Sequence, residues 1–313
     1  MCTVYDIAII GGGPAGMSAA IYAARGGMKT IVLEKLSCGG QVLKTYEIDN
    51  YPGFADNPTG EELAKAIENH AKKFDVTFVS ENVKSIENAE YDIKIIHTRK
   101  NKYMTKAIIF ATGATPKMLG ADGESLLQGA GVSYCATCDG AFFKDKDVCV
   151  IGGGNTAIED ALYLAPICSK VYVINRSKRF RASARLMETA RANGKIEFIE
   201  DSVVERFNGT AMLESVFVKN VVTGEKSTLK VAGAIVAIGV VPSSGIAKET
   251  GIETCERNFI KTDMYLATNI KGIFAAGDVR TTPLRQVITA AADGAVAATS
   301  AVNYVNELGI KSV

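Results

Sequence analysis

The sequence predicts an α/β protein of two three-layer domains, and three observations lead to that expectation. A buried strand, a glycine-rich turn and a helix follow one another at residues 4–25, and the same succession returns at 148–164. Strands that alternate with helices in this way favour a parallel sheet with helices on its faces. The chain of 313 residues is also long for one hydrophobic core. We therefore expect two Rossmann-like domains.

The first glycine turn is Gly11-Gly12-Gly13-Pro14-Ala15-Gly16, between an expected strand at 4–10 and an expected helix at 17–25. In such a turn the glycines permit the bend, the approach of a pyrophosphate and close helix packing, and the helix N-terminus faces the phosphates. Glu34 closes the next strand, which starts at residue 30, so its carboxylate can bind an adenosine ribose. The predicted dinucleotide site is Gly11, Gly13, Pro14, Ala15, Gly16, Glu34 and Lys35.

The second glycine turn, at 152–157, opens a helix to residue 164, and a strand follows at 170–174. Here the strand ends at Asn175 instead of an acid, and a basic run from Arg176 to Arg181 follows. Because arginine pairs with phosphate in a bidentate fashion, this favours a ribose with a 2′-phosphate, and hence NADPH over NADH. A solvated basic surface loop is the competing interpretation. The candidate residues are Gly152, Gly154, Asn155, Thr156, Ala157, Glu159, Asn175, Arg176 and Arg181.

A third strand pattern near the C-terminus ends at Gly277 and Asp278, and a helix rich in small residues follows from about residue 285 to 304. In flavoproteins of this architecture such an aspartate contacts the ribityl chain of FAD, and the helix N-terminus can face the flavin ring. The FAD domain is then discontinuous, with residues 1–116 and 242–313, and an NAD(P)H-binding domain fills 117–241. Thr112 and Gly113 lie at the first crossover, where the backbone can approach the adenine side of FAD.

The segment Cys135-Ala136-Thr137-Cys138-Asp139 lies just before the second nucleotide-binding strand. Two cysteines at this spacing can close a small disulfide ring, and nucleotides that deliver a hydride need an acceptor. We therefore predict a redox disulfide, with Asp139 either as proton carrier or as a helix cap. Zinc would need a second pair of ligands that the sequence lacks, and a pair of inert buried thiols is the remaining possibility.

Charge and cysteine usage exclude several classes of protein. Lys and Arg total 35 against 34 for Asp and Glu, so no excess charge favours nucleic acid or a membrane surface. No stretch predicts a membrane span or a secretion signal, and the odd count of seven cysteines suits a reducing cytoplasm. Cys149, in a strand pattern, and Cys168, in a helix pattern, are expected to be buried. No role is predicted for Cys2, Cys38 or Cys255.

With both glycine turns, the cysteine segment and Gly277-Asp278-Val279 in this order, the chain resembles bacterial low-molecular-weight thioredoxin reductases over essentially its whole length. The cysteine pair in the nicotinamide domain distinguishes that family from glutathione-reductase-like enzymes. The resemblance implies a homodimer that passes electrons from NADPH through FAD and the disulfide to thioredoxin. It further implies that Cys138 exchanges electrons with the flavin and that Cys135 attacks thioredoxin. Its additional FAD residues are Gly40, Gln41, Asn50, Val83, Arg285, Gln286 and Val287.

One departure from the family leaves the electron donor open. Members that use NADPH usually have His-Arg-Arg, three residues and then Arg, whereas this chain has Asn175-Arg176-Ser177 and then Arg181. NADH and reduced ferredoxin therefore stay possible donors. Three rival functions are weighed against this one. A reductase that serves a peroxidase carries an N-terminal extension, whereas the first strand here is expected to start near residue 4, and a ferredoxin or flavodoxin NADP reductase has no use for Cys135 and Cys138. A flavin-binding redox sensor would bind the cofactors but show negligible turnover.

Overall fold

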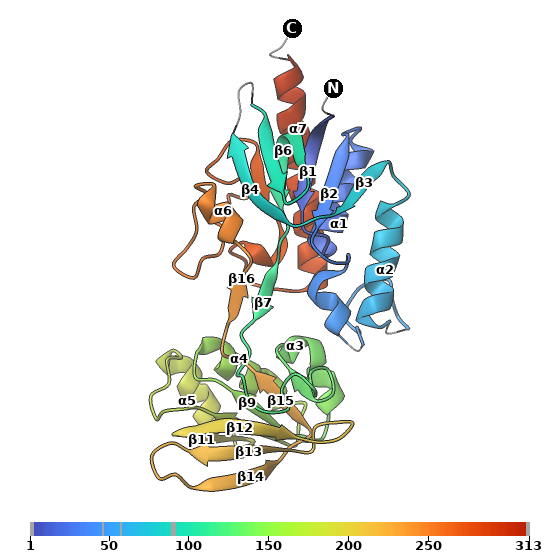
Figure 1. The fold of residues 1–313 in the computed structure, drawn as a ribbon. Coiled ribbons are helices and arrows are strands. Elements are labelled where there is room, and N and C mark those ends of the chain that lie inside the picture. Colours follow the sequence, from blue (N-terminus) through green and yellow to red (C-terminus); the bar gives the residue numbers. More distant parts are fainter. Residues whose placement is uncertain (1–2, 46, 57, 89–91, 311–313) are drawn as a thin grey trace. The chain divides into compact units, whose positions relative to one another are not determined.

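The computed structural model describes residues 3–45, 47–56, 58–88 and 92–310, which fold as two compact units (Figure 1). Unit 1 runs to Thr115 and resumes at Val241, and unit 2 comprises Pro116–Val240. The two connecting segments, β7 (Ala114–Pro116) and β16 (Val240–Pro242), pair with each other.

Unit 1 is built on a sheet in the order β3-β2-β1-β6-β5-β4, and β17 pairs with the second half of β6. The strands are β1 (Val4–Ile10), β2 (Thr30–Glu34), β3 (Val76–Ser80), β4 (Val83–Asn88), β5 (Lys94–Thr98), β6 (Lys102–Phe110) and β17 (Ile273–Ala275). Strands β3, β2, β1, β6 and β17 are parallel. The carboxyl ends of β1, β2, β6 and β17 therefore lie at one edge of the sheet.

Helices α1 (Pro14–Arg25) and α7 (Val287–Ile310) cover one face of this sheet and pack on each other. The approach is so close that a Cβ on Gly294 of α7 would lie 2.1 Å from the carbonyl oxygen of Ala15. A second core on the other face includes Ala247 of α6 (Gly245–Glu249). Helix α2 (Gly60–Ala71) and the 3-10 helix η1 (Gly40–Lys44) form a smaller cluster beside α1.

Unit 2 is built on a parallel sheet in the order β11-β10-β9-β15-β8. Its strands are β8 (Val132–Ser133), β9 (Asp147–Ile151), β10 (Lys170–Ile174), β11 (Ile196–Ile199) and β15 (Gly233–Val236). The helices α3 (Ala136–Asp139), α4 (Asn155–Leu164) and α5 (Ala184–Ala192) contribute to the core on one face. The antiparallel strands β12 (Ser202–Asn208), β13 (Ser215–Asn220) and β14 (Lys226–Lys230) cover the other. Two 3-10 helices, η2 (Gly140–Phe143) in unit 2 and η3 (Gly277–Val279) in unit 1, complete the described elements.

The structure confirms the predicted α/β class, with a sheet between two packed layers in each unit. The sheet of unit 2 is parallel, whereas that of unit 1 is mixed, because β5 is antiparallel to both β6 and β4. Two helix boundaries differ from the prediction, because α1 starts at Pro14 and α7 continues beyond Tyr304 to Ile310. Cys149 and Cys168 are both buried, as expected. The predicted helical position of Cys168 is wrong, since α4 ends at Leu164 and Cys168 lies in the bend that follows. Cys2 lies outside the described residues. No helix in the described part of the chain is both long and apolar enough to span a membrane.

Candidate nucleotide sites and redox centre

The first glycine turn brings the N-terminus of α1 to the carboxyl end of β1. Gly11 has φ +110°, and a Cβ there would lie 2.3 Å from the carbonyl oxygen of Ala111, so no larger residue fits. Gly13 caps α1 without a side-chain hydrogen bond, and the first helical turn carries no acid. The free N–H groups of this turn can therefore bind an anion such as a pyrophosphate.

Glu34 holds its carboxylate against this turn. The backbone N–H of Gly12 donates to Oε2 over 2.7 Å, and that of Leu36 donates to Oε1 over 3.1 Å. The remaining lone pairs of the carboxylate suit the hydroxyl donors of a ribose. Gly40 faces Gly13, and a Cβ on Gly40 would lie 3.2 Å from the Cα of Gly13. Because neither glycine has a side chain, only backbone atoms line the space beside them, and this space can accommodate the pyrophosphate of FAD.

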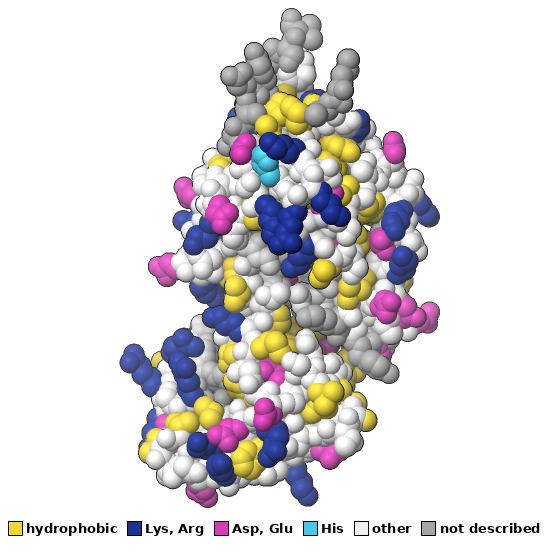
Figure 2. Space-filling model, in the orientation of Figure 1, with side chains coloured by type: hydrophobic (Ala, Val, Ile, Leu, Met, Phe, Trp, Pro, Cys, Tyr) yellow, Lys and Arg dark blue, Asp and Glu magenta, His cyan; other side chains and the backbone are white. Residues whose placement is uncertain are grey.

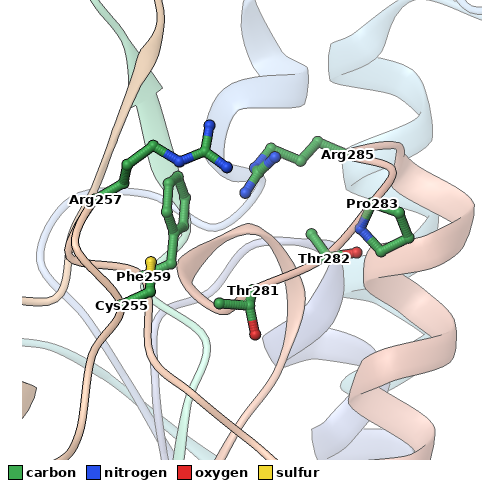
Figure 3. Close-up of a pocket in the computed structure, with 7 residues that line it drawn as sticks. All are labelled: Cys255, Arg257, Phe259, Thr281, Thr282, Pro283 and Arg285. Carbon is green, nitrogen blue, oxygen red and sulfur yellow. The ribbon is translucent and has the colours of Figure 1, made fainter.

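Arg285 lies in a cavity of about 300 Å³ in unit 1, where its guanidinium group and that of Arg257 point toward one another (Figure 3). The guanidinium carbon of Arg285 is 4.3 Å from the centre of the Phe259 ring. Its Nε atom is buried and has no hydrogen-bond partner in the described part of the chain. An unpaired buried donor of this kind fits a site for a bound polar group. The lining residues are Cys255, Arg257, Phe259, Thr281, Thr282, Pro283 and Arg285.

The carboxylate of Asp278 is electrostatically coupled to Arg285. Burial raises the pKa of Asp278 to about 6, the Arg285 charge opposes this shift, and the Asp293 charge adds to it. Burial also lowers the pKa of Arg285, against the attraction of Asp278. A ligand with hydroxyl groups, such as the ribityl chain of FAD, would supply an acceptor for the unpaired Nε of Arg285 and donors for the Asp278 carboxylate.

The remaining predicted residues of unit 1 lie in different environments. Ala15, Gly16, Val83 and Gly277 are buried, so their backbone alone could face a ligand. Lys35, Gly40, Gln41 and Asn50 are exposed, and Val287 is half-buried at the start of α7. The side-chain amide of Asn50 donates to Oε1 of Gln286 over 3.2 Å. The Thr112 hydroxyl donates to the carbonyl oxygen of Ser243, and Gly113 accepts from the Ser243 N–H, so both residues hold the chain near β7.

The strand order of unit 2 places the predicted redox cysteines and the predicted nucleotide-binding residues at one edge of its sheet. Strands β8, β15, β9 and β10 are neighbours and all parallel. Strand β8 ends two residues before Cys135, β9 ends directly before Gly152 of the second glycine turn, and β10 ends directly before Asn175. Ligands of open α/β sheets bind at this edge. The redox segment and the second nucleotide turn therefore share one end of the sheet, which their separation in the sequence does not show.

Cys135 and Cys138 form a disulfide, with Cα atoms 5.3 Å apart. Cys135 caps the short helix α3, whose Ala136 is buried in the core of unit 2. The segment packs tightly on α4, because a Cβ on Gly140 would lie 3.0 Å from a methyl carbon of Leu164. Both cysteines are half-buried. Packing of this segment on α4 therefore positions the disulfide, while both cysteines remain partly exposed.

Asp139 is held by Ser133, a residue that no sequence motif marks. The buried Ser133 hydroxyl is hydrogen-bonded to Oδ2 of Asp139 and accepts the backbone N–H of Cys135 over 3.1 Å. Asp139 precedes η2 but makes no side-chain capping bond to it, so the role as a helix cap is not observed. The contact fixes a carboxylate next to the disulfide segment, where it can exchange a proton with a thiol.

Three free thiols are poor nucleophiles. Burial raises the pKa of Cys149 to about 12 and, as the largest cause, that of Cys38 and Cys168 to about 11. Because the thiolate is the reactive form, these residues stay unreactive near neutral pH. Within the described ranges, no group of three or more His, Cys, Asp or Glu residues is arranged to hold a metal ion.

The second glycine turn repeats the geometry of the first. Gly152 has φ +149°, and a Cβ there would lie 2.5 Å from the carbonyl oxygen of Ala237. Gly154 caps α4 without a side-chain hydrogen bond, and no acid lies in the first turn. Of the predicted residues, Ala157 and Asn175 are buried, and Asn155, Thr156, Glu159, Arg176 and Arg181 are exposed. The uncapped N-terminus of α4, beside exposed arginines, fits the phosphates of a nicotinamide dinucleotide.

Asp160 on α4 predicts a pH-dependent stability. Burial raises its pKa from 3.8 to about 7, and the Glu159 charge adds to the shift. The unfolded carboxyl ionises near pH 4, so the cost of ionising this half-buried group in the folded protein grows as the pH rises from 4 to 7 and persists above 7. We expect Asp160→Asn to raise the free energy of unfolding by about 2 to 4 kcal/mol at pH 8 and little at pH 4. Urea unfolding at both pH values measures this.

Glu159→Gln, which changes an exposed neighbour, is the control and should give a much smaller difference in the free energy of unfolding between the two pH values. A gain for Asp160→Asn that is equal at both pH values would contradict the role of the Asp160 ionisation.

Comparisons with known proteins agree with this geometry. Residues 5–294 match the family described as pyridine nucleotide-disulphide oxidoreductase. A thioredoxin reductase of Peptoclostridium litorale is 44% identical over 98% of this chain and 99% of its own length. A thioredoxin reductase of Bacillus subtilis is 41% identical over 97% of this chain and 96% of its own. The crystal structure of thioredoxin reductase from Streptococcus pyogenes superposes with a TM-score of 0.94 at 41% identity and covers 98% of this chain and 100% of that one.

Proposed function

The chain belongs to the pyridine nucleotide-disulphide oxidoreductase family, and on that premise we propose that it reduces thioredoxin with electrons from NADPH. The observation that carries this proposal is the Cys135–Cys138 disulfide at the same sheet edge as the second nucleotide turn. A flavin reductase without a disulfide substrate has no use for such a pair.

FAD and NADPH are the cofactors of this flavoprotein oxidoreductase, and we assign each to one unit. Unit 1 would hold FAD through the first glycine turn, Glu34, Asp278 and the segment from Arg285 to Val287. Unit 2 would hold NADPH through the second glycine turn and the arginines after Asn175. A bound FAD would supply the two-electron chemistry that links a nicotinamide hydride to a disulfide.

In the thiol–disulfide exchange with thioredoxin, the two cysteines carry the electrons and Asp139 carries a proton. Two electrons and two protons convert the Cys135–Cys138 disulfide to a dithiol, with the protons supplied by NADPH and solvent. Cys135 then loses its proton to solvent, and its thiolate attacks the thioredoxin disulfide, which forms a mixed disulfide and releases one thioredoxin thiolate that takes up a proton from solvent. Cys138 attacks Cys135 in turn, which releases the second thiolate and restores the disulfide. Asp139 accepts the proton from Cys138 in this step and returns one when the pair is reduced.

The test is anaerobic reduction of the flavin, followed by addition of oxidised thioredoxin. We expect NADPH to bleach the flavin, and we expect oxidised thioredoxin, added in an amount equimolar to the flavin, to reoxidise it. A flavin that thioredoxin cannot reoxidise would refute the proposed substrate, and a redox sensor would behave in this way.

Reduced ferredoxin is a second candidate donor, because Ser177 replaces an arginine of the NADPH-binding pattern. The same experiment separates the donors, since bleaching by reduced ferredoxin and by neither nicotinamide would leave the second glycine turn without a redox role.

We further propose that the protein works as a homodimer in the cytoplasm, as the resemblance to bacterial thioredoxin reductases implies. Analytical ultracentrifugation of the FAD-loaded protein tests the first point, with a monomer at micromolar concentration as the result that would contradict it. Cell fractionation tests the second.

A further inference from the structure

We propose that Ser133 is a positioning residue that holds the Asp139 carboxyl group in place both when it is ionised and when it carries a proton. The inference rests on the proposed function, in which Asp139 accepts a proton from Cys138 and later returns one. It adds a residue outside the sequence motifs, which acts on the exchange with thioredoxin through Asp139.

The Ser133 hydroxyl lies within hydrogen-bonding distance of three groups of the redox segment. It donates to Oδ2 of Asp139, and it accepts the backbone N–H of Cys135 over 3.1 Å. Its Oγ atom is also 3.3 Å from the carbonyl oxygen of Cys135. A hydroxyl has one hydrogen and two lone pairs, so a full hydrogen bond can go to only one of the two acceptors at a time. The Asp139 carboxylate and the Cys135 carbonyl are therefore alternative acceptors for the same hydrogen.

These alternatives match the two protonation states of Asp139. When the carboxylate is ionised, the Ser133 hydroxyl donates to Oδ2 and accepts the Cys135 N–H. When the Cys138 thiol transfers its proton to Asp139, Oδ2 can become a donor, and the hydrogen of Ser133 turns to the Cys135 carbonyl. The Oγ atom then accepts both the Asp139 O–H and the Cys135 N–H, which fills its two lone pairs. Ser133 neither gains nor loses a proton, and its contact with Asp139 persists in both states.

The backbone that carries this hydroxyl is fixed, so the fold sets the direction of the Ser133 side chain. Ser133 is the last residue of β8, where it pairs with Ile235 of β15, and it is only 5% exposed. The next side chain is anchored separately, because the Tyr134 hydroxyl donates to Oε1 of Glu124 over 2.8 Å. Glu124 is 1% exposed and also accepts two backbone N–H groups. The residues directly before Cys135 are therefore held independently of the disulfide.

A local donor matters for Asp139 because the basic surface of unit 2 lies elsewhere. Figure 2 shows Lys and Arg side chains gathered on the surface beside α5. That helix packs on β11, which is the outer strand of the sheet on the side away from β8. Hydrogen bonds to an ionised group are stronger than those between neutral groups. The Ser133 hydroxyl is therefore a strong local restraint on the Asp139 carboxylate.

The rate of exchange between the NADPH-reduced, FAD-loaded protein and oxidised thioredoxin tests this role. Wild type is compared with Ser133→Ala, Asp139→Asn and the double variant. We expect Ser133→Ala to slow the exchange by about tenfold, since a hydrogen bond to a charged group contributes at least this much. In the Asp139→Asn background the same change should slow it by less than about twofold, because the group that Ser133 positions no longer carries a proton.

Two further variants separate positioning from folding. Ser133→Thr keeps the hydroxyl and should recover most of the exchange rate. Ser202→Ala removes another buried serine hydroxyl of unit 2, which donates to the carbonyl oxygen of Glu200 over 2.8 Å, and should leave the rate unchanged. Reduction of the flavin by NADPH, recorded for every variant, is expected to match wild type and shows that each protein is folded.

Three results would refute the role of Ser133. They are a wild-type exchange rate for Ser133→Ala, a tenfold loss that persists in the Asp139→Asn background, and a Ser133→Thr rate as low as that of Ser133→Ala. None of them would affect the proposed reductase, because Asp139→Asn would still be slow. If Asp139→Asn itself exchanges at the wild-type rate, the proton-carrier role of Asp139 in the proposed function is wrong, and the inference for Ser133 is refuted with it.

Discussion

Replacement of Cys135 with serine is expected to abolish thioredoxin reduction while NADPH still bleaches the flavin. A serine hydroxyl stays protonated near neutral pH and is a far weaker nucleophile than a thiolate, so turnover should fall by at least about a thousandfold. Nicotinamide binding should not change, because the second glycine turn is a separate segment on α4 and β9. Stopped-flow absorbance of the flavin measures its reduction by NADPH, and a turnover assay measures the reduction of thioredoxin.

Two further variants make this result specific. Cys168→Ala removes a buried free thiol of unit 2 that lies outside the redox segment and both glycine turns, and it should leave turnover unchanged. Cys138→Ser should form a stable mixed disulfide with a thioredoxin that has one activated active-site cysteine, whereas Cys135→Ser should form none. If Cys135→Ser forms the adduct and Cys138→Ser does not, Cys138 is the cysteine that attacks thioredoxin, and the two assigned roles are reversed.

Asp139→Asn is expected to slow the exchange between dithiol and thioredoxin by about a hundredfold, because general acid–base catalysis contributes on this scale. The amide has nearly the shape of the carboxylate and can still hydrogen-bond to Ser133, but it cannot carry a proton. The effect should appear when reduced enzyme is mixed with oxidised thioredoxin, and the dissociation constant for NADPH should be unchanged.

Asp145→Asn is the matched control, since Asp145 is an exposed aspartate of the same unit. Its φ of 57° is one that asparagine also adopts readily, so the variant should fold and react normally. Comparable losses in both variants would show that Asp139 acts through stability or net charge, and would remove its role as proton carrier.

Much of the site could be predicted because its signals are local. The glycine turns require positive φ at Gly11 and Gly152, and short backbone contacts exclude larger residues there. The cysteine pair is close in the sequence, so a disulfide between them needs only one turn of helix. These features depend on the conformation of a few consecutive residues, and the residue types reveal them.

Several parts of the molecule had no local signal. Arg257 and Phe259 lie in an irregular loop, without a motif, yet they line the cavity of Arg285. Strands β12–β14 cover one face of unit 2 but show no pattern that separates them from other surface strands. The end of α4 at Leu164, in contrast, has a local signal that the helical expectation for Cys168 overlooked, because Pro166 disfavours continuation of the helix.

The α/β class, the two strand-turn-helix units and the chemistry of the cysteine pair follow from the sequence alone, since backbone geometry and residue type specify these over short spans. Which of these groups meet in space depends on the tertiary structure. The order β10-β9-β15-β8 brings the second glycine turn and Cys135 to one edge, and packing places Ser133 on Asp139 and Asn175 beneath the basic loop. Such contacts depend on which strands pair and on how their ends align, and a short run of residues does not encode either.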